Sequence, residues 1–189
     1  RGPAGDQRLR YINTSPLRND LELKPFDPSV ASFGKGGASV TDVALEDEAG
    51  NRLAWVVGGE TVTLTIRAVA DRELRGAIIG FFVRDRLGQN LFGDNTVLAS
   101  ADEPLRVAPG EAIEARFVFD MPVLPIGDYS INVAIAEGNQ AEHVAHQWIH
   151  DALIFKSHAS SVTHSLIGIP MREIAIGLAA AEDLKEQSE

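Results

Sequence analysis

Residues 78–96 read Ile78-Ile79-Gly80-Phe81-Phe82-Val83-Arg84-Asp85-Arg86-Leu87-Gly88-Gln89-Asn90-Leu91-Phe92-Gly93-Asp94-Asn95-Thr96. The apolar start of this stretch predicts a buried strand. Leu87-Gly88 predicts a turn, because glycine readily takes the positive φ that tight turns need. A short returning strand and a polar loop at 94–96 complete the expected hairpin. Binding groups often lie on loops held by a rigid scaffold, so the rim of this hairpin is a candidate place for ligand contacts.

Apolar and polar residues alternate with a period of two elsewhere in the chain. One such run has Val62, Leu64, Ile66 and Ala68 on one face and Thr61, Thr63, Thr65 and Arg67 on the other. Residues 113–120 and 129–136 alternate in the same way, with turn signals at 48–51, 57–60, 108–110 and 125–128. Many short strands separated by turns predict an all-β fold, an antiparallel β-sandwich.

Tyr129 lies two residues after Gly127, at the start of one of these alternating runs. This position is typical of the tyrosine corner of immunoglobulin-like sandwiches, in which the hydroxyl bonds back to the preceding chain. A tyrosine that simply packs in the core explains the pattern equally well.

The chain divides into three expected parts. Residues 1–36 contain Pro3, Pro16, Pro25 and Pro28, which predict a linker and an irregular N-terminal arm, held to the body by Phe26 and Phe33. Residues 37–176 are the predicted sandwich domain. Residues 177–189 are a C-terminal tail, rich in Ala, Glu, Lys and Gln from Ala179 onward, either a short exposed helix or a frayed end.

The composition excludes several classes of protein. A formal net charge of -10 with a pI near 4.9 argues against a nucleic-acid partner, which requires basic residues to contact phosphates. The chain has no cysteine, so a disulfide scaffold and a Cys-based zinc site are both excluded. No apolar run is long enough to span a bilayer. No signal peptide is visible, although a chain that starts at Arg1 is expected to be a fragment.

His143, His146 and His150 lie within eight residues. On a helix they would share a face and could hold a metal. The flanking apolar residues instead favour a long strand, in which His146, Trp148 and His150 share one face and His143 points the other way. We therefore expect no metal site, and interpret these histidines as solvated bystanders or ligand contacts.

Trp148 and Trp55 are the only two tryptophans. An indole face matches the C–H face of a sugar ring, but most aromatic side chains serve burial. Trp148 is the better contact candidate because of the flanking histidines.

If the strands that carry Gly80 and Ala134 are neighbours, these small residues form the floor of a shallow trough. The expected carbohydrate contacts are Phe82, Arg84, Ser130, Asn132, His146, Trp148 and His150. Such a polar and aromatic trough suits a neutral sugar chain.

Other kinds of chemistry have no recognisable signal. Asp42, Glu46, Asp47 and Glu48 lack the spacing of an EF-hand loop, and we interpret them as a solvated strand edge. The glycines at 34–37 lack the phosphate-loop pattern, and no nucleophile elbow occurs. The chain thus shows no ATPase or other catalytic site, and we expect no cofactor and no enzymatic activity.

Several segments, in order, resemble the C-terminal domain of Wzt, the nucleotide-binding subunit of ABC transporters that export O-antigen polysaccharide. They are residues 33–40, 43–50, 80–96, Gly127-Asp128-Tyr129 and 146–155. The resemblance covers roughly residues 26 to 170.

The resemblance implies an immunoglobulin-like sandwich that binds carbohydrate and has no catalytic role. It implies a cytoplasmic location at the inner face of the inner membrane, behind an ATPase domain and next to the membrane subunit. The expected ligand is O-antigen polysaccharide, in particular its non-reducing terminal region. The family also implies a homodimer, with exchange of the strand at Val162–Ile176 as one arrangement.

Two other functions compete with this interpretation. A dimerisation or docking module of the transporter, with no glycan contact, would present a flat apolar face. A metal-dependent enzyme would use the histidines at 143–150.

Overall fold

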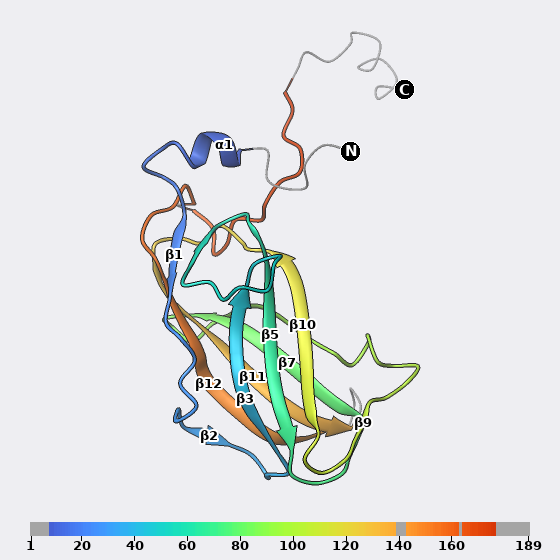
Figure 1. The fold of residues 1–189 in the computed structure, drawn as a ribbon. Helices are drawn as coiled ribbons and strands as arrows, with labels where there is room; N and C mark the ends of the chain where they lie inside the picture. Colours follow the sequence, from blue (N-terminus) through green and yellow to red (C-terminus); the bar gives the residue numbers. More distant parts are fainter. Residues whose placement is uncertain (1–7, 139–142, 163, 177–189) are drawn as a thin grey trace, which may run out of the picture.

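Two antiparallel β-sheets pack face to face in the computed structural model, which describes residues 8–138, 143–162 and 164–176 (Figure 1). The elements are α1 (Leu9–Ile12), β1 (Asp20–Leu23), β2 (Ser32–Phe33), β3 (Ala38–Glu46), β4 (Trp55–Val57), β5 (Thr61–Ala70), β6 (Leu74–Arg75), β7 (Ala77–Asp85), β8 (Asn90–Asn95), β9 (Arg106–Val107), β10 (Ala112–Asp120), β11 (Gly127–Gly138) and β12 (His143–Ser157). The all-β sandwich predicted from the alternation is confirmed.

The larger sheet has the strand order β4-β1-β12-β11-β7-β8, and β2 pairs with β12 beside β1. The smaller sheet has the order β10-β5-β3, and β6 and β9 form a separate pair. We call these the large sheet and the small sheet. Among the described residues, no helix is long and apolar enough to cross a membrane.

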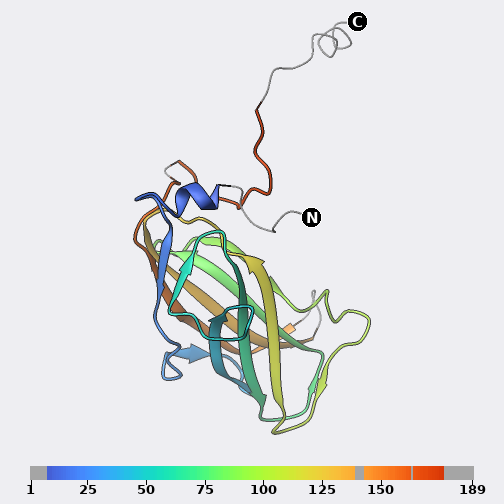
Figure 2. The same ribbon diagram turned by 45° about the horizontal axis from the view of Figure 1, so that its top comes forward.

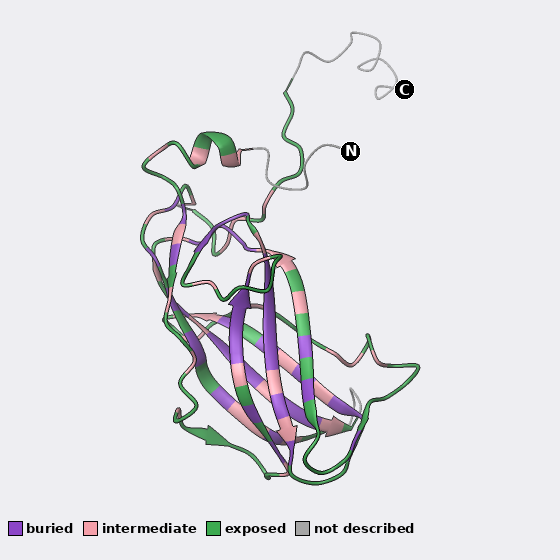
Figure 3. Ribbon diagram, in the orientation of Figure 1, coloured by how far each residue is buried: buried purple, intermediate pink, exposed green. Residues whose placement is uncertain are grey.

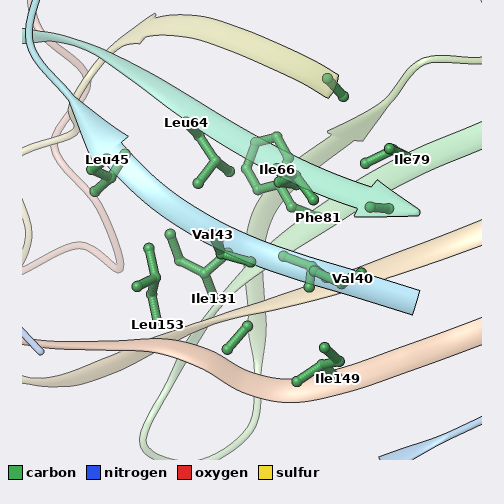
Figure 4. Close-up of a cluster of buried hydrophobic side chains, with 14 of the residues drawn as sticks. Val40, Val43, Leu45, Leu64, Ile66, Ile79, Phe81, Ile131, Ile149 and Leu153 are labelled. Atoms are coloured by element: carbon green, nitrogen blue, oxygen red, sulfur yellow. The ribbon is translucent and has the colours of Figure 1, made fainter. Parts of the chain in front are cut away.

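The core lies between the inner faces of the two sheets (Figure 4). Val43 and Leu64 from the small sheet face Phe81, Ile131 and Leu153 from the large sheet (Figure 4). Along β10 the buried residues alternate with exposed ones, as the sequence predicts (Figure 3). A fully buried Val, Leu, Ile or Phe side chain in this core contributes roughly 1.5–3 kcal/mol through removal of apolar surface from water.

The hairpin of β7 and β8 forms as the opening stretch predicts. Gly88 has a φ of 80°, and the Asp85 carboxylate accepts hydrogen bonds from the backbone N–H groups of Leu87 and Gln89, both at 2.9 Å. Gly93 is required by close packing, because a Cβ there would lie 2.2 Å from the carbonyl oxygen of Phe81.

The N-terminal arm is more regular than the sequence predicts. β1 pairs with both β12 and β4, and β2 pairs with β12. The reason is that proline disrupts regular structure only near its own position. The residues between Pro16 and Pro25 are therefore free to form a strand, and Leu21 within it is fully buried. Phe26 packs against the core as expected, whereas Phe33 remains 58% exposed on the sheet surface.

The segment after β12 leaves the sandwich. Its contact with the body includes an isolated bridge between Val123 and Gly168, and the chain from there to Ile176 extends away from the sheets (Figure 2). The expected tail at 177–189 lies outside the described residues.

The tyrosine corner is present. The Tyr129 hydroxyl donates a hydrogen bond to the carbonyl oxygen of Pro125 at 2.8 Å. The ring is buried and stacks on Phe155 at 5.5 Å between centroids. Burial and the nearby Asp85 raise the pKa of the Tyr129 hydroxyl, so it stays a neutral donor.

Replacement of Tyr129 by Phe tests this corner. The change leaves the carbonyl of Pro125 without its partner, so we expect a loss of about 1–2 kcal/mol in the free energy of unfolding. Urea denaturation followed by circular dichroism measures it. Tyr11→Phe is the control, since Tyr11 is 63% exposed. Equal midpoints for the two variants would show that the hydroxyl has no structural role.

Candidate functional site

A hollow of about 230 Å³ lies on the outer face of the large sheet, over β7, β8, β11 and β12. Gly80 on β7 and Trp148 on β12 are both register partners of Ala134 on β11. The trough predicted from these small residues therefore exists. Its lining consists of Ile78, Gly80, Phe81, Phe82, Asp94, Asn95, Val97, Asn132, Val133, Ala134, Ala136, His143, Ala145 and Trp148.

Small side chains create the hollow. A Cβ at Gly80 would lie 3.0 Å from the Cβ of Asn95, so even alanine crowds this position. Ala134, Ala136 and Ala145 continue the row of small residues across β11 and β12. Larger side chains on either side of this row project further from the sheet and form the walls of the hollow.

Three aromatic rings form one wall and continue onto the sheet surface; we call them the aromatic strip. Trp148 stacks on Phe82 from β7 at 6.1 Å and 25°, and on Phe33 from β2 at 6.3 Å and 19°. Phe82 is 39% exposed and Phe33 is 58% exposed, which leaves much ring surface open to solvent. The strip offers the flat apolar surface that matches the C–H face of a sugar.

His150 extends this strip at its exposed side. Its ring lies 5.5 Å from Phe33 and 6.2 Å from Trp148 between centroids. Nδ1 of His150 lies 3.1 Å from Nδ2 of Asn132. The Asn132 oxygen accepts from the backbone N–H of Asp151 at 2.9 Å, which fixes the orientation of the amide. Nδ2 of Asn132 therefore donates to His150, and the neutral ring carries its proton on Nε2.

Asn132 holds a bulge together. β11 pairs Ile131 with Leu153 and Val133 with Ile149, so one residue on β11 faces three on β12. Asp151, in this bulge, has a φ of 53°, which an aspartate tolerates better than most residues. The buried Asn132 side chain satisfies the bulge backbone and shapes the floor, and its amide is engaged inside the protein.

The facing of the histidines differs from the sequence prediction. A second bulge pairs Ile135 with Gln147 and Ala136 with Ala145, so His146 has no register partner. His146 is 2% exposed and lies away from the hollow, whereas His143 lines it. The prediction that His146 shares a face with Trp148 and His150 is wrong, because each extra residue in a strand reverses the alternation.

His146 instead fastens the N-terminal arm. Its Nδ1 lies 2.6 Å from the carbonyl oxygen of Gly36, and its Nε2 lies 3.2 Å from Oε2 of Glu137. A Cβ at Gly34 would lie 2.2 Å from the carbonyl oxygen of His146. Gly34 is thus needed for the arm to lie against β12, and this close approach positions Phe33 beside Trp148.

Arg84 and Ser130 lie in a different hollow of about 300 Å³, which also involves Asp85, Asp128 and Asp151. They are register partners on β7 and β11. Arg84 Nε donates to the carbonyl oxygen of Gly88 at 2.9 Å, which stabilises the hairpin turn. These two predicted contacts are therefore outside the aromatic hollow, while Phe82, Asn132 and Trp148 are inside it.

Sequence reasoning missed Phe33, Ile78, Val97 and Ala145 as parts of this surface. Phe33 carried a signal, since the glycines that follow it indicate a close backbone approach. Val97 lies in a loop, and no periodicity could have placed it.

Among residues 8–138, 143–162 and 164–176, no group of three or more His, Cys, Asp or Glu side chains could hold a metal. Asp42 and Glu46, whose spacing in the sequence does not fit a calcium loop, both form ion pairs with Arg67.

The carboxylate of Glu137 couples the arm fastening to pH. Its pKa is lowered mainly by the backbone N–H of Arg75, which donates to it at 2.7 Å, and further by Arg72 at 2.8 Å. A carboxylate whose pKa is lowered in the folded state stabilises the fold above its unfolded pKa, near 4.5, and this contribution is lost as the pH falls through the lowered value.

Glu137→Gln tests this coupling. Since the amide cannot titrate, the variant should be less stable than the parent at pH 7, and the difference should shrink below pH 4.5. Urea unfolding at a series of pH values measures the difference. Glu48→Gln, on an exposed turn, should match the parent throughout. A stability difference for Glu137→Gln that stays constant with pH would contradict the coupling.

Comparisons with known proteins agree with this architecture. The model of the Wzt C-terminal domain family matches residues 29–169. A solved structure described as the crystal structure of the C-terminal domain of Wzt has a TM-score of 0.64 at 21% identity, and the match covers 81% of this chain and 93% of that one. A search of curated proteins found no match.

The fold and the hollow define an all-β sandwich domain with an aromatic recess on the outer face of one sheet. The chain belongs to the Wzt C-terminal domain family. It is thereby the C-terminal domain of a subunit of an O-antigen ABC transporter.

Proposed function

We propose that this domain is a non-catalytic carbohydrate-binding module that recognises O-antigen polysaccharide, in particular its non-reducing terminal region. The observation that carries the proposal is the aromatic strip beside a hollow floored by Gly80 and Ala134. A sugar stacked on Trp148 and Phe82 would bury its C–H face, and its remaining hydroxyls would face water or the polar rim.

The contacts that we assign follow the geometry. Phe82, Trp148 and His150 bind the sugar, with Phe33 as a further aromatic surface. Arg84 and Ser130 contact an adjacent unit of the polymer in the second hollow. Asn132 is a positioning residue, because its amide holds the bulge that presents His150.

Membership of the family supports a proposal for the cellular setting. We place the domain in the cytoplasm, at the inner face of the inner membrane, where the ATPase domain and the membrane subunit of the transporter are its partners. A homodimer is the expected state, with the apolar segment after β12 available for exchange. Glycan binding would influence export only through different affinities for different transporter states.

Titration of the domain with the O-polysaccharide of its own strain, followed by amide NMR, tests the proposal. Trp148→Ala should weaken binding at least about tenfold, equivalent to about 1.4 kcal/mol, since it removes the central ring of the strip. Ala134→Leu should weaken binding as strongly, because the larger side chain fills the floor of the hollow. Ala134 is partly exposed on the outer face, so this variant should keep the fold.

The chain provides a matched control. Trp55 is also partly exposed and stacked on a histidine, His158, but it lies on β4 at the far edge of the large sheet. Trp55→Ala should bind normally. Trp55→Phe leaves Trp148 as the only tryptophan, so its fluorescence reports directly on the hollow.

The glycan structure gives a second comparison. Binding of the native polysaccharide but not of one without its terminal modification would support recognition of the chain end. Equal binding of both would assign recognition to the repeat unit. Absence of binding at millimolar polysaccharide would reject the proposal in favour of a docking module.

A further inference from the structure

The aromatic hollow offers a ligand few hydrogen-bonding groups. Asn132 is engaged with His150 and Asp151. The Asn95 oxygen accepts from the backbone N–H of Val97 at 2.9 Å. One oxygen of Asp94 accepts from the backbone N–H of Asn95 at 2.7 Å. Asn132 is therefore fully engaged inside the protein, while the second oxygen of Asp94 and the amide nitrogen of Asn95 remain as the polar groups of the β8 side.

The backbone of the floor is engaged as well. β7 lies between β8 and β11, and β11 lies between β7 and β12, so both strands are paired on either side. Backbone N–H and C=O groups in such inner strands bond to their neighbours. Apart from Asp94, Asn95 and His143, the surface is mainly hydrocarbon, from Ile78, Phe82, Val97, Ala134 and Ala145. Trp148 adds the face of its indole, while its Nε1 is buried and has no partner among the described residues.

This chemistry selects among sugars. A hydroxyl placed against the hydrocarbon part of the hollow, rather than beside Asp94, Asn95 or His143, would lose its water without gaining a protein partner, which is unfavourable. A methyl group in the same place would gain from burial. An acetamido group would be disfavoured, because both its N–H and its carbonyl need partners.

We infer that the hollow binds the methyl group of a 6-deoxyhexose residue of the glycan and discriminates against the parent hexose, which carries a hydroxymethyl group. This inference rests on the proposed carbohydrate-binding function and adds the class of sugar. His143 and Asp94, both exposed at the rim, leave the ring hydroxyls in contact with water and polar groups.

Pairs of methyl glycosides that differ only at C6 test the inference on the full chain. Methyl α-L-rhamnopyranoside is compared with methyl α-L-mannopyranoside, and methyl α-L-fucopyranoside with methyl α-L-galactopyranoside, by amide NMR titration. In at least one pair the 6-deoxy sugar should bind at least about tenfold more tightly than the parent hexose. The reason is that the C6 hydroxyl of the hexose would be placed in an apolar pocket. Titration up to about 100 mM would saturate a site with a Kd near 10 mM.

An isosteric change in the wall makes the test specific. Val97→Thr supplies a hydroxyl to the hollow and should reduce the preference for the 6-deoxy sugar at least about threefold, because the hexose hydroxyl then finds a partner. Val118→Thr is the matched control. Val118 is 64% exposed on β10 of the small sheet, and the same substitution there should leave the preference unchanged.

The outcomes separate this inference from the proposed function. If the O-polysaccharide binds and Trp148→Ala abolishes binding, the proposed function stands. In that case the inference is overturned by equal affinities in both pairs, by tighter binding of the methyl glycoside of N-acetylglucosamine than of either 6-deoxy sugar, or by no detectable 6-deoxy sugar binding at about 100 mM. If neither polysaccharide nor any glycoside binds, both proposals fail.

Discussion

The pairing of β11 with β12 is the constraint on which the rest of the structure depends. These two strands run along the middle of the large sheet, and their register shifts twice, after Ile131 and after Ile135. The shift after Ile135 adds one residue to β12 and so reverses which side chains face the core, whereas the shift after Ile131 adds two and leaves the alternation beyond it unchanged. The one-residue shift buries His146 and brings His143 to the hollow, and the other bulge, held by Asn132, fixes the position of His150. The composition of the candidate site thus depends on both bulges.

Each bulge is stabilised by a polar side chain that the sequence indicated only as a candidate ligand contact. Asn132 satisfies the backbone of Asp151 and at the same time orients the His150 ring. His146, in the other bulge, contacts Gly36 and Glu137 and so holds the arm against β12. Buried polar groups with all partners in place specify one arrangement among several similar ones. Here they specify a register, and through it a surface.

The N-terminal arm contributes to the candidate site and to the sheet. β1 extends the large sheet beyond β12, and β2 places Phe33 next to Trp148. Gly34 and Gly37 allow this approach, because a Cβ at Gly34 would collide with the backbone of His146 and one at Gly37 would crowd the side chains of Arg72 and His146. The aromatic strip thus combines residues from three strands, one of which belongs to a segment that sequence patterns alone describe as irregular.

The sequence by itself determined the fold class and the hairpin of β7 and β8, offered the tyrosine corner as one of two alternatives, and gave the trough over Gly80 and Ala134 as a hypothesis that depended on their strands being neighbours. These features depend on period-two alternation, glycine positions and turn residues, which act over a few neighbouring residues. Only the tertiary structure decided the facing of His143 and His146, the separation of Arg84 and Ser130 from the aromatic hollow, and the place of Phe33. The physical reason is that a bulge shifts the register by pairing with a strand distant in the sequence, and the alternation within one strand does not reveal where such a shift occurs.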